Sequence, residues 1–190
     1  MCSRRNKFIE AVISLAAKIP TFRSDKRGTS AIELSFFVGL LAFGMLNVAD
    51  ISIYIYKRME VENATQMGVQ AAWKNCDPNN GYVPATTNCP NLTTDITAAV
   101  TSTSLGANVQ LQSGSPSEGY YCVNSSDTLQ YVSSVSSKPA DCTAAGMPSN
   151  QPGDYITVAT TYAYAPLFPN LTVAGAFTTP ITKTAFMRLN

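Results

Sequence analysis

A long apolar run near the start of this chain constrains its fold more than any other feature. From Leu34 to Tyr56 the sequence reads LSFFVGLLAFGMLNVADISIYIY, 23 residues in which Asp50 is the only charged side chain. A helix that crosses a bilayer needs about 20 predominantly apolar residues. Asp50 lies near one end of the run and Glu33 directly precedes the other, where an acid costs less than at mid-span. The run therefore predicts one transmembrane helix over residues 34–56.

Charge is distributed unevenly on the two sides of this run. Residues 1–28 contain seven Lys/Arg and two Asp/Glu, whereas residues 29–190 contain six and ten. By the positive-inside rule the basic end stays cytoplasmic, and the larger C-terminal part is exported. The basic residues thus indicate membrane topology, and we expect no nucleic-acid partner.

The helix is expected to continue beyond the membrane, over residues 29–75. After Lys57 and Arg58 the pattern becomes amphipathic, which is typical of a helix that packs on a globular domain. The apolar stripe expected to face that domain consists of Val61, Ala64, Met67 with Gly68, Ala71 and Trp73. Turn-forming residues from Asp77 to Gly81 are expected to end the helix.

Residues 76–190 predict an extracytoplasmic α+β domain with an antiparallel sheet of about four strands. A short helix is expected over 91–104, with Leu92, Ile96, Val100 and Leu105 facing inward. Alternating β-branched and aromatic residues predict an antiparallel pair of strands at 154–165 and 182–189. Residues 109–112 and 119–123 are expected to form a hairpin, followed by a long loop, 124–153, with a helical turn near 129–135.

Four of the five cysteines lie on the exported side of the predicted span: Cys76, Cys89, Cys122 and Cys142. Cys2 precedes the span. An even number of cysteines in an oxidising compartment indicates two disulfides, for which three pairings exist. Cys76–Cys89 and Cys122–Cys142 are favoured because each pair is close in sequence. The spacing does not match a zinc site, and the chain has no histidine.

The residue types argue against an enzyme. Without histidine, the commonest general base is missing and a Ser-His-Asp arrangement is excluded. The exported carboxylates are scattered and are expected to be solvated loop acids: Asp77, Asp95, Glu118, Asp127, Asp141 and Asp154. We therefore expect no catalytic residues, no metal and no cofactor, and a membrane-anchored enzyme is disfavoured.

The residues around Gly28 resemble the processing site of type IV prepilins. More narrowly, RGTSAIEL, the apolar run and the later NATQMGVQAAW resemble TadE-like proteins, the minor pilins (pseudopilins) of tight-adherence pili. The resemblance covers residues 26–74, with Leu34 where many members carry an aromatic residue. It implies a pilin-like fold, a long N-terminal helix packed on a small sheet.

The resemblance also implies residue roles and partners. A prepilin peptidase would remove the cytoplasmic leader, residues 1–28, by cutting between Gly28 and Thr29. Glu33 would then be the fifth residue and would attract the new amino terminus of a neighbouring subunit during assembly. The expected partners are the peptidase, other pilin and minor pilin subunits, the inner-membrane assembly platform and the bilayer. Expected locations are the bacterial inner membrane and, after assembly, the extracellular pilus, where the protein would act in surface attachment.

Two alternatives stay open. Glu33 can instead be a carboxylate at the headgroup boundary with no role in assembly. An uncut chain would be a single-pass membrane protein with a periplasmic binding domain.

Overall fold

The computed structural model describes residues 27–76, 81–177 and 179–190, and the chain divides into two compact units, residues 1–47 and 48–190. The expectations for the leader, for Cys2 and for the turn beginning at Asp77 concern residues outside these ranges. Two of the helices are longer than four residues, α2 (Arg27–Asn75) and α4 (Leu92–Thr101), within the described ranges. Shorter helices are α3 (Ala85–Asn88), η3 (Gly106–Asn108), η4 (Thr143–Ala145) and η5 (Val173–Ala176).

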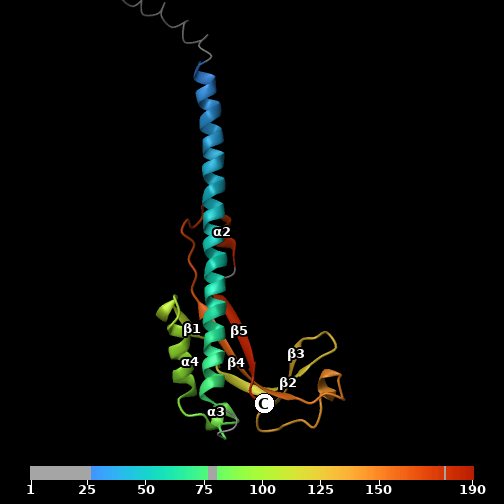
Figure 1. Cartoon of the computed structure of the whole chain (residues 1–190). Coiled ribbons are helices and arrows are strands. Elements are labelled where there is room, and N and C mark those ends of the chain that lie inside the picture. Colours follow the sequence, from blue (N-terminus) through green and yellow to red (C-terminus); the bar gives the residue numbers. More distant parts are fainter. Residues whose placement is uncertain (1–26, 77–80, 178) are drawn as a thin grey trace, which may run out of the picture. The chain divides into compact units, whose positions relative to one another are not determined.

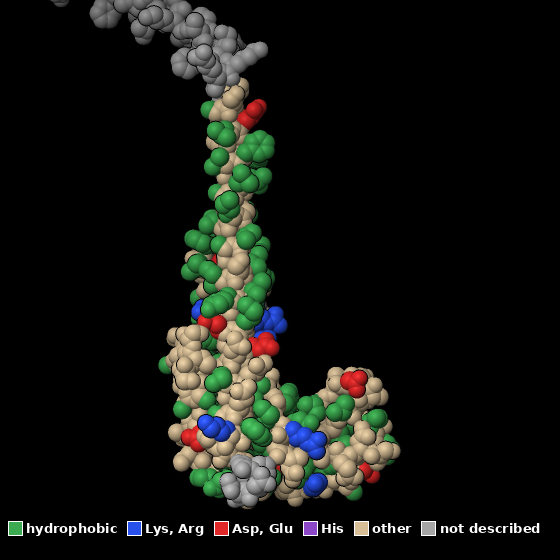
Figure 2. All heavy atoms as spheres, in the orientation of Figure 1, with side chains coloured by type: hydrophobic (Ala, Val, Ile, Leu, Met, Phe, Trp, Pro, Cys, Tyr) green, Lys and Arg blue, Asp and Glu red, His purple; other side chains and the backbone are tan. Residues whose placement is uncertain are grey.

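Helix α2 has 49 residues and agrees closely with the helix predicted over 29–75. It is long and apolar enough to cross a membrane, with a mean hydropathy of 1.9 in its most apolar window. Hydrophobic side chains cover much of the visible surface of its N-terminal half (Figure 2). One candidate membrane span is therefore present in the part of the chain described.

The second unit contains a five-stranded antiparallel sheet (Figure 1). Strand β4 (Gly153–Tyr162) is its centre and pairs along one edge with β5 (Ile181–Arg188). Along its other edge, β4 pairs first with β2 (Ser117–Val123) and then with β1 (Val109–Leu111). The outermost strand, β3 (Leu129–Ser134), pairs with β2. The antiparallel pair expected from 154–165 and 182–189 is confirmed.

Two sequence predictions for this sheet are wrong. Residues 109–112 and 119–123 do not form a hairpin, because β1 and β2 both pair with β4 rather than with each other. The chain between them follows the same edge of β4: Gln112 N donates to Ala159 O at 2.9 Å, and Ala159 N donates to Ser115 Oγ at 2.9 Å. The helical turn expected near 129–135 is strand β3, which forms the hairpin with β2 instead.

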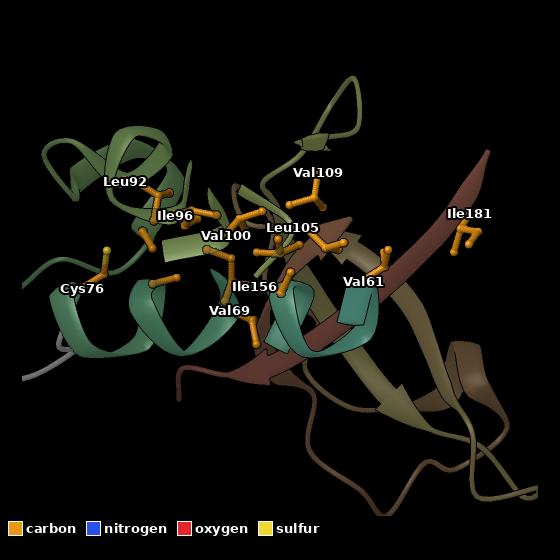
Figure 3. Packing of buried hydrophobic residues seen from close by; sticks show 14 of the residues in the cluster. Val61, Val69, Cys76, Leu92, Ile96, Val100, Leu105, Val109, Ile156 and Ile181 are labelled. Carbon is orange, nitrogen blue, oxygen red and sulfur yellow. The ribbon is translucent and has the colours of Figure 1, made fainter. Parts of the chain in front are cut away.

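The core lies where the C-terminal half of α2 meets the sheet and α4 (Figure 3). Val61 and Val69 of α2 are buried with Ile96 and Val100 of α4 and Ile156 of β4. The inward residues predicted for the short helix, including Leu92 and Leu105, are also buried.

The stripe predicted on α2 is partly wrong. Val61, Ala64 and Gly68 are buried as expected, but Met67 and Trp73 are exposed. Their places are taken by Thr65, Val69 and Ala72, which continue the burial at a helical spacing. Thr65 is tolerated there because its hydroxyl is 2.6 Å from that of Thr160 on β4.

Two disulfides attach loop segments to α2 and to the sheet. Cys76–Cys89 joins the end of α2 to the segment after α3, with a Cα–Cα distance of 5.5 Å. Cys122–Cys142 joins β2 to the loop that follows β3, with a Cα–Cα distance of 5.8 Å. These are the two pairings that the cysteine positions favour. A long apolar helix, a small antiparallel sheet and two disulfides make this an α+β protein.

Candidate functional site

The residues singled out for processing and assembly lie in the first turns of α2. Gly28 and Thr29 are helical, and Glu33 follows Thr29 by one helical turn. Both Thr29 and Glu33 are exposed. Residues four apart lie on the same side of a helix, so the carboxylate of Glu33 lies on the same face as Thr29.

The surface that follows Glu33 is apolar on every side of the helix. From Ile32 to Met45, nine large hydrophobic side chains are 49–72% exposed within the first unit. Apart from the nearby backbone of the helix itself, no atom of the described residues lies within 4 Å of the position that a Cβ atom would take at Gly39 or Gly44. A helix that is hydrophobic all round is stable inside a membrane or a large protein core, and not in water. This part of α2 therefore requires lipid or other apolar helices around it.

Asp50 is the centre of a hydrogen-bonded cluster in the second unit. Its side chain is fully buried, at 0% exposure. Oδ1 accepts a 2.9 Å hydrogen bond from Leu167 N, and Oδ2 accepts hydrogen bonds from the Thr172 hydroxyl and, at 3.4 Å, from Phe168 N. The Tyr164 hydroxyl lies 3.4 Å from Oδ1. The donors around Asp50 thus come from one segment far along the chain.

Lys57, the first cation after Asp50 in the sequence, pairs with another acid: its Nζ lies 2.7 Å from Oε2 of Glu60. Glu60 is itself nearly buried and also accepts a hydrogen bond from the Ser104 hydroxyl. Burial opposes its ionisation, yet these bonds hold the pKa of the Glu60 carboxyl below its usual value.

Tyr54, one turn after Asp50, holds the same distant segment by ring contacts. Its ring centroid lies 5.1 Å from that of Tyr164 and 4.6 Å from that of Phe177. We call residues 164–177 the collar, since Asp50 and Tyr54 attach it to α2. Burial, together with the charge of Asp50, raises the pKa of the Tyr164 hydroxyl. No local pattern in the sequence links Asp50 to the collar, so sequence reasoning missed this cluster.

A second buried acid, Asp154, lies at the start of β4. The expectation that it is a solvated loop acid is wrong: it is 4% exposed, and its Oδ1 has no hydrogen-bond partner among the residues described. Burial raises the pKa of this carboxyl to about 6; the charge of Glu118 adds to the rise and Lys138 opposes it. A signal was present, because Asp154 is in phase with the buried Ile156 and Val158 of an alternating strand.

Glu118 on β2 also departs from the expectation of a free loop acid. Its carboxylate accepts hydrogen bonds from Ala85 N at 2.8 Å and from Thr86 N at 2.7 Å. These are the first two amides of α3, so Glu118 attaches that short helix to the sheet.

The described ranges contain no group of three or more His, Cys, Asp or Glu side chains that could hold a metal ion. A shallow groove of about 440 Å³ runs between α2 and β5, lined among others by Glu62, Val69, Lys183 and Phe186. Lys183 Nζ pairs there with Oε2 of Glu62 at 2.8 Å.

Comparisons with protein families, with curated proteins and with solved structures found no match. The resemblance to TadE-like pilins therefore rests on residues 26–74 of the sequence.

Proposed function

We propose that this chain is a TadE-like prepilin that is cut after Gly28 and then takes part in assembling or capping a tight-adherence pilus. The observation that carries the proposal is one continuous helix that combines three features in order. Its first turn contains Gly28 and Thr29, Glu33 follows one turn later, and the helix then continues with an apolar surface exposed on every side. A structured, disulfide-linked domain on the same chain favours a minor pilin over a bulk fibre subunit.

The span in this proposal begins and ends earlier in the chain than residues 34–56, the range predicted from the sequence. Asp50 has its hydrogen bonds from the collar, and Ile53 and Tyr54 pack against the core of the second unit. We place the membrane segment at Thr29–Ala49, 21 residues or about 31 Å of helix. That length matches the hydrocarbon core of a bilayer, which is about 30 Å thick.

Within that span, Glu33 is the single carboxylate. A charged group in hydrocarbon is tolerated mainly when it is paired. Cleavage before Thr29 creates an ammonium group near the same depth of the membrane, and a neighbouring subunit would bring that cation to Glu33. The proposal therefore gives Glu33 a partner that exists only after processing.

The decisive experiment determines the amino terminus of the full chain isolated from the membrane of its native host. We expect the mature chain to begin at Thr29, and we expect Gly28→Ala to stay uncut. Gly39→Ala is the matched control, because it makes the same substitution in the same helix at a position with open space around it. That variant should be cut normally.

A wild-type chain that still carries residues 1–28 in a host whose peptidase processes other prepilins would overturn the proposal. It would leave the other reading, an uncut single-pass membrane protein with an exported binding domain.

A further inference from the structure

The collar lies in an unusually long stretch without charge. From Tyr155 to Thr182 the chain has 28 residues and no Asp, Glu, Lys or Arg. In the first part of this stretch the absence of charge is expected, because these residues form β4 and part of the core. The collar, in contrast, is largely at the surface. Leu167, Leu171 and Val173 are 61%, 50% and 55% exposed. Three exposed large aliphatic side chains within seven residues, with no charge beside them in sequence, form a surface poorly suited to water.

The attachment of the collar fixes where this surface lies along α2. The carboxylate of Asp50 holds the backbone amides of Leu167 and Phe168 and the hydroxyl of Thr172. Tyr54 holds the collar by its ring contacts one turn later. Asp50 directly follows Ala49, the last residue of the proposed span. The exposed aliphatic side chains therefore belong to a segment attached at the residue where the apolar run ends.

We propose that the collar is a second membrane-contacting element, whose Leu167, Leu171 and Val173 enter the headgroup region of the leaflet from which α2 emerges. This inference rests on the proposed membrane span. Arg58, an exposed basic residue, follows the span by about two and a half turns, where phospholipid phosphates are available to cations.

A bilayer fits this surface better than a water-soluble protein partner does. Interfaces between soluble proteins have a polar rim around an apolar centre, whereas the collar sequence offers no charged side chain for such a rim. Its continuity with the proposed span also requires lipid to be close by. A second copy of this chain is the competing occupant, and the test below separates the two.

The test measures depth by fluorescence quenching in the full chain, reconstituted into phosphatidylcholine–phosphatidylglycerol vesicles. Trp73, the single tryptophan, is exposed and is replaced by Phe. One tryptophan is then introduced at a time, as Leu171→Trp in the collar, Leu40→Trp in the proposed span or Val123→Trp on β2. All three native side chains are exposed, which makes the variants comparable. Lipids brominated near the headgroup quench from the interface, lipids brominated near the chain ends quench from the bilayer centre, where Leu40 of the proposed span lies, and acrylamide quenches from water.

We expect Leu171→Trp to lose emission with the lipid brominated near the headgroup. Relative to Val123→Trp, it should also be shielded from acrylamide. Quenching of Leu171→Trp by acrylamide alone would overturn the collar proposal while Leu40→Trp still reported the span. Shielding of Leu171→Trp from both quenchers would overturn it as well, since the collar would then be covered by protein. If Leu40→Trp were not quenched by the lipid brominated near the chain ends, the span itself would fail and the collar proposal with it.

Discussion

The carboxylate of Asp50 on α2 accepts a 2.9 Å hydrogen bond from the backbone amide of Leu167, 117 residues later in the chain. Because the carboxylate of Asp50 also accepts hydrogen bonds from Phe168 N and the Thr172 hydroxyl, one buried side chain satisfies three donors of the collar. The collar is thus held to the helix by polar contacts, while its largest aliphatic side chains stay exposed.

Asp50→Ala should detach the collar from α2. Buried donors left without an acceptor cost about 1–3 kcal/mol each, so for three donors we expect the free energy of unfolding to fall by about 3 kcal/mol or more. Hydrogen exchange of the full chain in detergent micelles should show faster exchange at Leu167 and Phe168. Glu62→Ala is the matched control, because Glu62 forms a half-exposed ion pair with Lys183, worth about 1 kcal/mol or less. Unchanged exchange in the Asp50 variant would contradict the assigned role.

Asp154 should make the second unit less stable as the pH rises. Its pKa is about 6 in the folded chain, against about 3.9 for a free Asp. Between these values the folded state binds more protons than the unfolded state, so the stabilising contribution is complete below about pH 4 and is lost as pH rises through about 6. Two pKa units correspond to at most about 3 kcal/mol.

Asp154→Asn removes this titration and should be more stable than the wild type at pH 7, with the difference vanishing near pH 4. Urea unfolding at several pH values measures it. Groups near Asp154 are Glu118, which favours its proton, and Lys138, which opposes it. Asp141→Asn is the control: hydrogen bonds from Thr143 lower the pKa of Asp141, so this variant should be less stable than the wild type at pH 7, and the difference should shrink only as pH falls below about 4. A difference for Asp154→Asn that is constant with pH would contradict the assignment.

Gly68 allows α2 to approach the sheet and α4 closely. A Cβ atom there would lie 2.7 Å from Val100 Cγ2 and 3.3 Å from both Ile96 Cγ2 and Val158 Cγ1. Overpacking of this kind costs about 1–3 kcal/mol, of which better helix propensity recovers up to about 1 kcal/mol. Gly68→Ala should therefore be destabilised by about 1 kcal/mol in urea unfolding.

The clash at Gly68 can be tested by a double-mutant cycle. In Gly68→Ala with Val100→Ala, the closest methyl group is removed, so the combined loss of stability should be smaller than the sum of the two single losses. Gln70→Ala on the exposed side of the same helix should be close to neutral. Additive losses would show that the contact with Val100 does not limit the helix position.

The disulfide Cys122–Cys142 should stabilise mainly the outer hairpin of β2 and β3. Its cysteines are 20 positions apart, and closing a loop of this size contributes about 3 kcal/mol in the chain-entropy model. Replacing both cysteines by serine should raise hydrogen exchange in β3 and η4 far more than in β4. The double variant at Cys76 and Cys89 should instead affect the end of α2. Equal effects of the two variants on β3 would argue against separate roles.

The sequence predicts those parts of the fold that are set by local patterns. Strands β4 and β5 alternate strongly, and α2 shows first an apolar run and then a helical stripe, so all three were expected. Strand β3 was missed because Leu129 and Tyr131 are exposed and, apart from Val132, the other residues of the strand are polar. Its position depends on pairing with β2, and no local pattern in the sequence indicates that pairing.

The same distinction applies to the functional residues. Gly28, Thr29 and Glu33 are close in sequence, so their spacing on one helix follows from the helix alone. The Asp50 cluster depends on donors at Leu167, Phe168 and Thr172, which only the tertiary fold brings together. The sequence therefore shows that Asp50 is unfavourable inside a membrane span, but it does not show which residues bind its carboxylate.

Glu33→Gln tests the assembly role separately from processing. The substitution keeps the size of the side chain and removes the charge, so the chain should still be cut after Gly28 and begin at Thr29. Without the carboxylate, the amino terminus of a neighbouring subunit loses its counter-charge in the membrane, where unpaired charges are costly. A loss of only about 1.4 kcal/mol lowers the association constant roughly tenfold. Co-purification of tagged and untagged chains from the membrane, together with the amount recovered in sheared pili, measures it. Ser35→Ala is the control, since its exposed hydroxyl donates a 2.8 Å hydrogen bond to Ile32 O within the same helix. Normal assembly of the Gln variant would leave Glu33 as a headgroup-level carboxylate without a role in assembly.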